Sequence, residues 1–345
     1  MLRLPAFAYL RPTTLDEATA MLRDEGTAEG APLRLVAGGT DLWPNMKRRH
    51  QKASGVVSLM GIPELAHIEA NGELHIGATS LLADVERHPE VRRRYPALAT
   101  AVASISSPPL RNMGTLGGNL CVDTRCTYYN QTEDWRRSID FCKKEEGEIC
   151  WVAPGSPRCW AHAASDAAPM LCALKSRVRL VSADGERVVP LEALYRNDGI
   201  DYLTRRADEI LAEVLVPPES DARRCRTAFW KLRRRGSIDF AVLSVAVALW
   251  IADDGTVEEA RIFLGAVSSA PVHAEQAAQE LTGKRLDADA IAAAAAAARK
   301  PATPLDMTDF TPQWRSAMVP RYTEAAVREA AGLDPGLTPP HHVRF

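Results

Sequence analysis

The residues best suited to chemistry are the cysteines, because five of the seven in the chain lie close together. These five are Cys121, Cys126, Cys142, Cys150 and Cys159. The stretch around them contains tyrosine and tryptophan but few aliphatic residues, so it needs a cross-link or a metal centre to hold it together. Disulfides are disfavoured because the number of cysteines is odd and no signal peptide is recognisable.

The spacing of the last four cysteines bears on which metal centre they could form. It contains no C-x-x-C knuckle, which gives little support to a zinc ribbon. Four thiolates are equally the ligand set of a [4Fe–4S] cluster. From the residues alone, iron–sulfur and zinc remain open alternatives, with unliganded thiols as a third. The candidate metal ligands are Cys126, Cys142, Cys150 and Cys159.

Two glycine-rich turns form a second chemical feature. Glycine lets the backbone take positive φ, so that N–H groups at Gly114, Gly117 and Gly118 could converge on an anion such as phosphate. The segment 35–42 has the same pattern of a short apolar strand, a Gly-Gly turn and a hydroxyl residue. One such motif alone could be a simple tight turn, whereas two could clamp a pyrophosphate from both sides. Neither matches the G-x-G-x-x-G fingerprint or the P-loop pattern, so a Rossmann or Walker assignment has no support.

The elements around these motifs predict a mixed helix and strand chain in several parts. Residues 1–60 fit a β-α-β unit with a helix over 15–24, opened by the capping box of Thr14 and Glu17. Residues 61–217 contain two hairpins, at 65–78 and 177–190, short helices at 81–87, 97–103 and 166–174, and a strand at 209–217. The cysteine-rich insertion occupies about 121–161. Beyond a Pro-rich linker, residues 223–333 read as strands at 227–232, 241–251 and 257–265 with helices at 271–281 and 287–299, and 334–345 as a tail.

Composition narrows the function classes. The 345 residues are 46% apolar and 25% charged, which is ordinary for a soluble globular protein of two or three domains. A net charge of −2 argues against a nucleic-acid binder. No segment is long and apolar enough to span a membrane. We therefore expect a cytoplasmic protein in a reducing compartment that binds neither nucleic acid nor membrane.

With these motifs placed, the chain resembles the FAD-binding subunit of the xanthine-oxidase family of molybdenum hydroxylases over nearly its whole length. The resemblance is carried by Ala37–Leu42, by Gly114–Asn119, by Ser165-Asp166 before Pro169, by Glu209-Ile210-Leu211, and by Leu264–Val267. It implies an α+β fold: a two-part FAD-binding domain of the vanillyl-alcohol-oxidase (PCMH-like) type, interrupted by the insertion, plus a C-terminal α+β flavoprotein domain. The two FAD-binding subdomains would be 1–60 and 61–217, and the flavoprotein domain 223–333.

The resemblance also implies roles for single residues. The two glycine turns would hold the FAD pyrophosphate, and Asp166 would hydrogen-bond the ribityl chain. Ile210 and Leu211 would pack near the isoalloxazine ring, with Lys231 close to the flavin. The residues of the two turns are Ala37, Gly38, Gly39, Thr40, Asp41, Leu42, Gly114, Thr115, Gly117, Gly118 and Asn119. No acid–base catalytic pair is expected in this chain.

The long insertion is similar to that of the β subunits of 4-hydroxybenzoyl-CoA reductases, where it carries a [4Fe–4S] cluster. Cys126, Cys142, Cys150 and Cys159 match that ligand pattern, which leaves Cys121 as a bystander. The implied function is electron transfer from a ferredoxin-like donor through the cluster and FAD to a small subunit with two [2Fe–2S] clusters. A molybdopterin-binding large subunit would then reductively dehydroxylate an aromatic CoA thioester, in a dimer of heterotrimers.

Two alternatives stand beside this interpretation. One is the FAD subunit of an oxidising hydroxylase, of the xanthine or CO dehydrogenase type, in which the extra cluster is only a relay. The other is a flavin-free binding module whose four cysteines hold structural zinc. A flavin is stable with zero, one or two electrons, so in either enzyme it could join one-electron carriers to a two-electron reaction.

Overall fold

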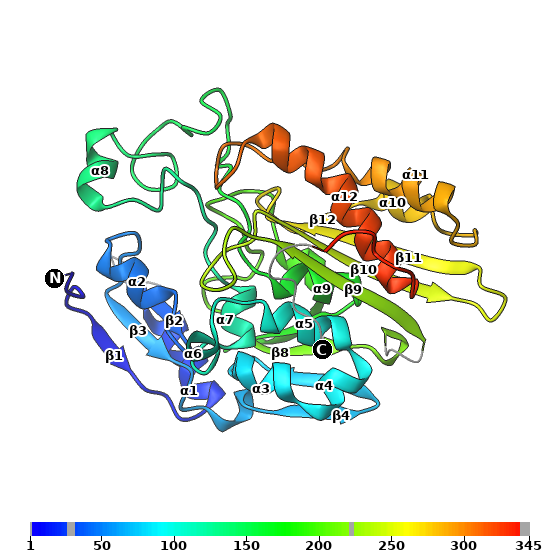
Figure 1. The fold of residues 1–345 in the computed structure, drawn as a ribbon. Helices are drawn as coiled ribbons and strands as arrows, with labels where there is room; N and C mark the ends of the chain where they lie inside the picture. The colour runs from blue at the N-terminus through cyan, green and yellow to red at the C-terminus, as the bar shows by residue number, and fades with distance from the viewer. Residues whose placement is uncertain (1, 26–31, 221–223, 339–345) are drawn as a thin grey trace.

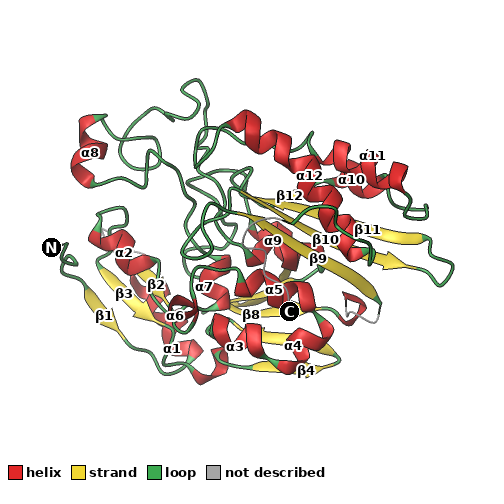
Figure 2. Ribbon diagram, viewed as in Figure 1, coloured by secondary structure: helices red, strands yellow, loops and turns green. Residues whose placement is uncertain are grey.

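The N-terminal part of the chain is a small β-α-β layer. The computed structural model describes residues 2–25, 32–220 and 224–338, and Figures 1 and 2 show its architecture. Strands β1 (Ala8–Leu10), β3 (Gly55–Ser58) and β2 (Arg34–Val36) form a parallel sheet in that order, accompanied by helices α1 (Leu15–Glu25) and α2 (Leu42–Lys47). The backbone N–H of Glu17 donates to Thr14 Oγ1 over 3.2 Å, so helix α1 begins where the capping box predicts.

The second part is a five-stranded antiparallel sheet covered by short helices. Its order is β4-β5-β8-β6-β7, and both predicted hairpins are present. The strands are β4 (Ile68–Asn71), β5 (Glu73–Gly77), β6 (Arg177–Ser182), β7 (Gly185–Pro190) and β8 (Ile210–Val216). The helices are α3 (Leu82–Arg87), α4 (Pro89–Arg94), α5 (Pro96–Ala103), α6 (Pro108–Arg111), α7 (Leu116–Leu120) and α9 (Ala167–Ala173), with 3-10 turns η1 (Pro63–Leu65), η2 (Leu191–Leu194) and η3 (Pro218–Ser220).

The C-terminal part is a four-stranded antiparallel sheet with helices on one face. The strands, in the order β12-β11-β10-β9, are β12 (Val272–His273), β11 (Val257–Gly265), β10 (Leu243–Ile251) and β9 (Cys225–Leu232). The helices are α10 (Glu275–Gln279), α11 (Ala288–Ala298) and α12 (Pro312–Ala330). The helix predicted over 271–281 begins only at Glu275, because Val272 and His273 pair with β11 instead. Residues 339–345 of the predicted tail and 221–223 of the linker lie outside the described residues.

The long helix α12 was not predicted from the sequence. Its start has a clear signal, since Thr311 Oγ1 accepts a hydrogen bond from Trp314 N over 3.2 Å. Pro320 inside the helix removes a backbone donor and normally ends such a pattern. The helix continues because Val319, Tyr322 and other apolar residues are buried against the C-terminal sheet (Figure 1), and that packing outweighs the local preference.

Alternate residues of the C-terminal sheet enter two different cores. On β10, Val245 and Val247 pack beneath α11 and α12, whereas Ala246 and Ala248 belong to the core of the five-stranded sheet and its helices. This alternation is the period of two expected for a strand buried on both faces. The linker after β8 therefore separates parts that share a hydrophobic core, and the predicted division into domains remains a proposal about the chain's organisation.

The cysteine-rich insertion projects from a narrow base. Arg125 and His162 face each other in an antiparallel bridge, with N–H to O distances of 2.9 and 2.8 Å, so the chain leaves and returns at one point. Between them the only helix among the described elements is α8 (Glu133–Ser138), in the upper part of Figure 1. The insertion contacts the C-terminal end of α2, because Arg136 donates to the carbonyl of the C-cap residue Arg48 over 2.7 Å. It also contacts the C-terminal part through Thr127 N and the carbonyl of Met307, 2.9 Å apart.

Candidate functional site

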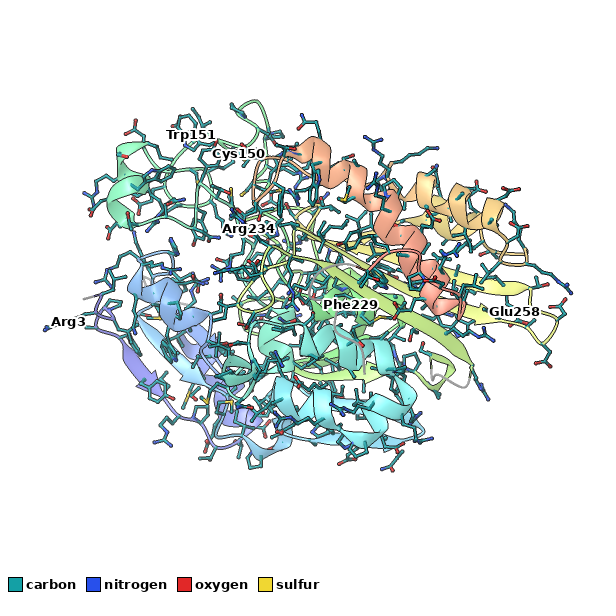
Figure 3. The ribbon with its side chains drawn as sticks, viewed as in Figure 1. Arg3, Cys150, Trp151, Phe229, Arg234 and Glu258 are labelled. Carbon is teal, nitrogen blue, oxygen red and sulfur yellow. The ribbon has the colours of Figure 1, made fainter. Side chains whose placement is uncertain are left out.

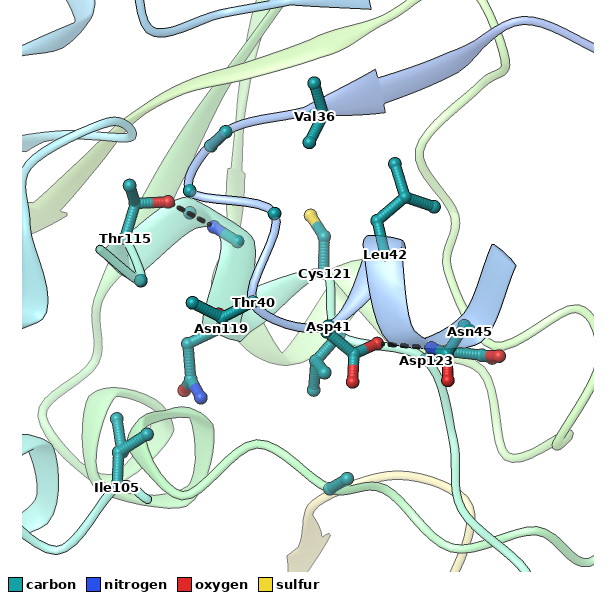
Figure 4. Close-up of a pocket in the computed structure, with 18 of the residues that line it drawn as sticks. Val36, Thr40, Asp41, Leu42, Asn45, Ile105, Thr115, Asn119, Cys121 and Asp123 are labelled. Atoms are coloured by element: carbon teal, nitrogen blue, oxygen red, sulfur yellow. Dashed lines mark hydrogen bonds between the residues drawn. The ribbon is translucent and has the colours of Figure 1, made fainter. Parts of the chain in front are cut away.

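A cavity of about 550 Å³ lies where the N-terminal layer, the five-stranded sheet and the base of the insertion meet (Figure 4). This volume is within the usual range for cofactor and ligand pockets. Thirteen of the fifteen residues predicted to bind FAD line it: Ala37, Gly38, Gly39, Thr40, Asp41, Leu42, Gly114, Thr115, Gly117, Gly118, Asn119, Asp166 and Leu211. The structure thus brings together two turns that are far apart in the sequence.

The two glycine turns touch one another. A Cβ on Gly38 would overlap the carbonyl oxygen of Met113, and a Cβ on Gly114 would lie 3.4 Å from Thr40 Oγ1. Of the turn glycines, only Gly39 has positive φ, at +70°. The expectation of positive φ at the second turn was wrong, because glycine is needed there for close approach: a Cβ on Gly117 would lie 2.6 Å from Ala78 Cβ.

The second turn is fixed by hydrogen bonds within the protein. Thr115 Oγ1 accepts from Gly118 N over 3.1 Å and so caps α7, as the dashed line in Figure 4 shows. Asn119 Oδ1 accepts from Ser165 Oγ over 2.8 Å and from Ala167 N over 3.3 Å. These bonds tie the end of α7 to the start of α9 and hold Asp166 at the cavity wall.

Asp166 forms a buried ion pair with Lys231. The ammonium donates to Asp166 Oδ2 over 2.7 Å and to the carbonyls of Ser104 and Asp239, each over 3.0 Å. Burial raises the pKa of Asp166 and lowers the pKa of Lys231, and the opposite charges offset part of both effects. Asp166 Oδ1 is buried and accepts no hydrogen bond within the described residues. It is therefore a free acceptor at the cavity wall.

Two of the predicted FAD contacts do not line the cavity. Lys231 lies behind Asp166, so any contact with a ligand would pass through that carboxylate. Ile210 packs in the core of the N-terminal layer with Leu22 and Val57. Successive side chains of a strand point to opposite faces, and only Leu211 of this pair faces the cavity.

Other wall residues were missed by sequence reasoning. Arg125, at the base of the insertion, forms an ion pair with Asp41 and lies 5.1 Å above the ring of Phe240. Burial lowers the pKa of Arg125 to about 10. Ile238 and Phe240 are exposed and come from the loop after β9. The sequence offered one signal of a ligand site here, because two large apolar residues stand in an otherwise polar loop.

These features fit the dinucleotide that the sequence suggested. The glycine turns let backbone approach a ligand closely, and Asp166 Oδ1 offers an unused acceptor for a hydroxyl group. Arg125 supplies a cation beside the same space. When bound, FAD would supply one- and two-electron chemistry that no side chain of the cavity provides.

The four cysteines of the insertion are buried and close to one another. Cys126, Cys142 and Cys159 share one small core with Tyr129. A hydrogen bond between Cys150 and Cys159 lowers the pKa of Cys150 to about 5 and raises that of Cys159. Burial, with smaller contributions from the neighbouring thiols of Cys142 and Cys150, raises the pKa of Cys126 to about 12.

Proximity of the cysteines does not by itself identify a metal. Among residues 2–25, 32–220 and 224–338, no group of three or more His, Cys, Asp or Glu side chains is arranged to hold a metal ion. A [4Fe–4S] cluster binds each thiolate through a different iron, so its ligands need not converge on one point as they do around zinc. The assignment of the four cysteines as ligands stays a prediction. Cys121 is not part of this group and instead lines the cavity described above.

The fold and the cavity define an FAD-binding subunit of an oxidoreductase. Residues 5–219 match the family described as the FAD binding domain in molybdopterin dehydrogenase, and residues 227–330 match the CO dehydrogenase flavoprotein C-terminal domain. The chain belongs to this family, the FAD-binding medium subunits of molybdenum hydroxylases. This membership favours the flavin-binding interpretations over a flavin-free zinc module.

Three similar proteins illustrate the family. The nicotinate dehydrogenase FAD-subunit of Eubacterium barkeri is 28% identical over 81% of this chain and 81% of its own length. The aldehyde oxidoreductase FAD-binding subunit of Escherichia coli is 30% identical over 81% of this chain and 87% of its own. A solved structure of carbon monoxide dehydrogenase from Hydrogenophaga pseudoflava, lacking the Mo-pyranopterin moiety, superposes with a TM-score of 0.77 at 27% identity, covering 96% of this chain and 99% of the other.

No helix in the described part of the chain combines the length and the apolar character needed to cross a membrane.

Proposed function

We propose that this chain holds FAD in the cavity of Figure 4 and acts as the electron-transfer subunit of a molybdenum hydroxylase-type complex. The observation that carries the proposal is the convergence of both glycine turns and the free oxygen of Asp166 on one cavity. Its partners would be a molybdopterin-binding large subunit and a small subunit with two [2Fe–2S] clusters. The relatives support this assembly, since one is named a carbon monoxide dehydrogenase medium chain. A cytoplasmic, heterotrimer-based assembly remains a prediction.

The relatives favour an oxidising enzyme. They are named dehydrogenases of nicotinate, carbon monoxide and xanthine, which remove electrons from their substrates. In this chain the FAD would then receive electrons originating at the large subunit and deliver them outward. The comparisons thus support the oxidising alternative better than the reductase that the sequence first suggested.

We further propose that the insertion carries a [4Fe–4S] cluster bound by Cys126, Cys142, Cys150 and Cys159. The comparisons support the FAD but not this cluster, which rests on the four cysteines and on the resemblance of the insertion described above. Cys150 is buried, while its neighbours Ile149 and Trp151 are exposed. Figure 3 shows Cys150 and Trp151 near the periphery of the molecule. Toward the cavity, Cys126 directly follows Arg125, which lines the cavity wall. A cluster here would lie between the protein surface and the flavin, where a relay to an external one-electron carrier belongs.

A reductive role is the second candidate, and the four-cysteine insertion is the observation that favours it. Four thiolates surround a cluster with negative charge, which favours its oxidised form and lowers its reduction potential. A low potential suits electrons entering from a ferredoxin-like donor for reductive dehydroxylation of an aromatic CoA thioester. Product analysis of the whole complex, with added donors and with added acceptors, separates the two directions.

The composition of the purified protein tests both cofactor assignments. Anaerobically purified chain should contain about four iron and four acid-labile sulfide per FAD, as one [4Fe–4S] cluster requires. The Cys142→Ser variant should lose iron and retain FAD, and Cys225→Ser, at a buried cysteine of strand β9 that does not line the cavity, is the matched control that should retain both. Zinc without sulfide would refute the cluster, and absence of FAD from the wild-type protein would refute the flavin proposal.

A further inference from the structure

A buried ion pair between Lys144 and Asp123 lies between the four cysteines and the cavity of Figure 4. Lys144 follows the cysteine at 142 by two positions, and its ammonium donates to Asp123 Oδ1 over 2.8 Å. It also donates to Thr124 Oγ1 over 2.8 Å and to the carbonyl of Gly199 over 2.6 Å. The side chains of Lys144 and Asp123 are each only 6% exposed. All three ammonium hydrogens are used, so the position of the charge is fixed.

The ammonium end of this pair adjoins the cysteines. Gly199, whose carbonyl binds Lys144, donates its N–H to the carbonyl of Cys159 over 3.0 Å. A Cβ on Gly199 would lie 2.6 Å from Cys159 Sγ, so the glycine backbone packs directly on that sulfur. Lys144 therefore binds the same glycine that packs on Cys159 Sγ, and its positive charge lies beside the cysteines.

The carboxylate end of the pair adjoins the cavity. Asp123 is a wall residue of the cavity and is labelled in Figure 4. Its Oδ2 accepts from Gln51 Nε2, another wall residue, over 3.1 Å. Tyr202 lines the same cavity, and its ring centroid lies 5.5 Å from the ammonium of Lys144. The pair is thus oriented, with its cation toward the cysteines and its anion toward the cavity.

We propose that the Lys144–Asp123 pair sets the electron equilibrium between the two cofactors, favouring the reduced cluster and the oxidised flavin. This inference rests on the proposed function, because it requires FAD in the cavity and a cluster on the cysteines. Reduction adds negative charge to a cofactor, so a nearby cation stabilises the reduced form and a nearby anion destabilises it. Because both charges are buried, solvent and salt screen them little. The bias favours electron flow from flavin to cluster, which is the direction an oxidising enzyme needs.

The two cofactor potentials test the proposal without any assay of activity. In the full chain loaded with FAD and iron, potentiometric titration would follow the cluster by electron paramagnetic resonance and the flavin by absorbance. Lys144→Met should make the cluster about tenfold or more harder to reduce, which is about 59 mV per tenfold for one electron. Asp123→Asn should make the flavin easier to reduce by a similar factor. Lys143→Met is the matched control, because that lysine adjoins Cys142 but its ammonium donates to the carbonyl of Pro157 over 3.3 Å at an exposed site. This change should shift the cluster potential severalfold less.

The outcomes separate this proposal from the one beneath it. A wild-type chain without iron and sulfide overturns the cluster assignment, and the inference fails with it. A wild-type chain with both cofactors, whose potentials stay unchanged in Lys144→Met and in Asp123→Asn, overturns the inference alone. If Lys144→Met does not fold, a flavin potential unmoved by Asp123→Asn is sufficient to refute it.

Discussion

Replacing Lys231 with methionine should destabilise the protein strongly, although Lys231 does not line the cavity. Methionine has a similar length but no charge, so the change removes the ammonium while filling most of its volume. The carboxylate of Asp166 then remains buried, with both oxygens lacking a protein donor. The carbonyls of Ser104 and Asp239 also lose their shared donor.

The size of the effect follows from burial. The side chains of Lys231 and Asp166 are 4% and 5% exposed, so water cannot replace the lost partner without opening the structure. Breaking one side of a buried ion pair costs about 3–5 kcal/mol in the free energy of unfolding. Replacing both partners is milder, because no unpaired charge remains. The double variant Lys231→Met/Asp166→Asn should therefore be at least about 1 kcal/mol more stable than Lys231→Met alone.

Urea unfolding of the flavin-free protein at pH 7, followed by tryptophan fluorescence, measures these differences without a contribution from FAD binding. Lys284→Met is the matched control, because Lys284 pairs with Glu280 on the surface over 3.1 Å and both side chains are about half exposed. That change should cost less than about 1 kcal/mol. If Lys231→Met costs no more than the control, or if the double variant is no more stable than Lys231→Met, then the ammonium does not compensate the carboxylate as argued.

Three further results are expected. Gly38→Ala should lower FAD content and cost about 1–3 kcal/mol in stability, because its Cβ would overlap the backbone of Met113. Glu209→Gln should lower the free energy of unfolding by about 1–3 kcal/mol at pH 7. Arg187 binds this carboxylate and lowers its pKa below 4.5 in the folded protein. The stability advantage of the wild type is therefore full above pH 4.5 and is lost as the pH falls through the lower pKa of the folded state. Burial lowers the pKa of His50 to about 4, so its contribution is full above pH 6.5 and falls by up to about 3 kcal/mol toward pH 4.

Each of these results has its own check. Gly155→Ala, at a glycine with no atom within 4 Å of an added Cβ, should leave stability and FAD unchanged. For Glu209→Gln, a stability difference from wild type that persists unchanged at pH 3 contradicts the assigned cause. His50 contacts the insertion at the carbonyl of Gln131 over 3.0 Å, so the protection factors of the insertion's amides, which correct for the intrinsic pH dependence of hydrogen exchange, should fall between pH 6.5 and 4. In His50→Gln that fall should be smaller.

Local patterns were enough to predict most of the fold. The two hairpins follow from alternating apolar residues around Asn71-Gly72 and Asp184-Gly185, where the glycines take φ of +88° and +132°. Helix α12 escaped prediction because Pro320 argues locally against a helix, and only the sheet beneath it supplies the stabilising contacts. Two sheets also contribute to one hydrophobic core. This arrangement depends on residues far apart in the sequence, so no local motif predicts it.

Some residues of the candidate site could likewise be predicted from local patterns, and others could not. The glycine turns could be found because close backbone approach demands a particular residue type. Ile210 was misplaced because the sequence does not say which face of a buried strand meets the cavity. Arg125 and Phe240 went unnoticed because they reach the wall from an insertion base and a loop whose positions depend on the whole fold. Lys144 resembles any other lysine in the sequence, and its burial becomes apparent only in three dimensions.

The narrow base of the insertion has a consequence for how this subunit could have arisen. Arg125 and His162 are joined as neighbours in a hairpin are, and two antiparallel residues so placed can be connected by a two-residue turn. The 36 residues from 126 to 161 could therefore have been gained, or exchanged between relatives, without rearranging the strands on either side. The insertion is therefore a segment that can be added or removed as one unit. Its acquisition would add an entry or exit point for electrons to an existing flavoprotein, and Lys144 and Arg136 are among the residues that contact the rest of the chain.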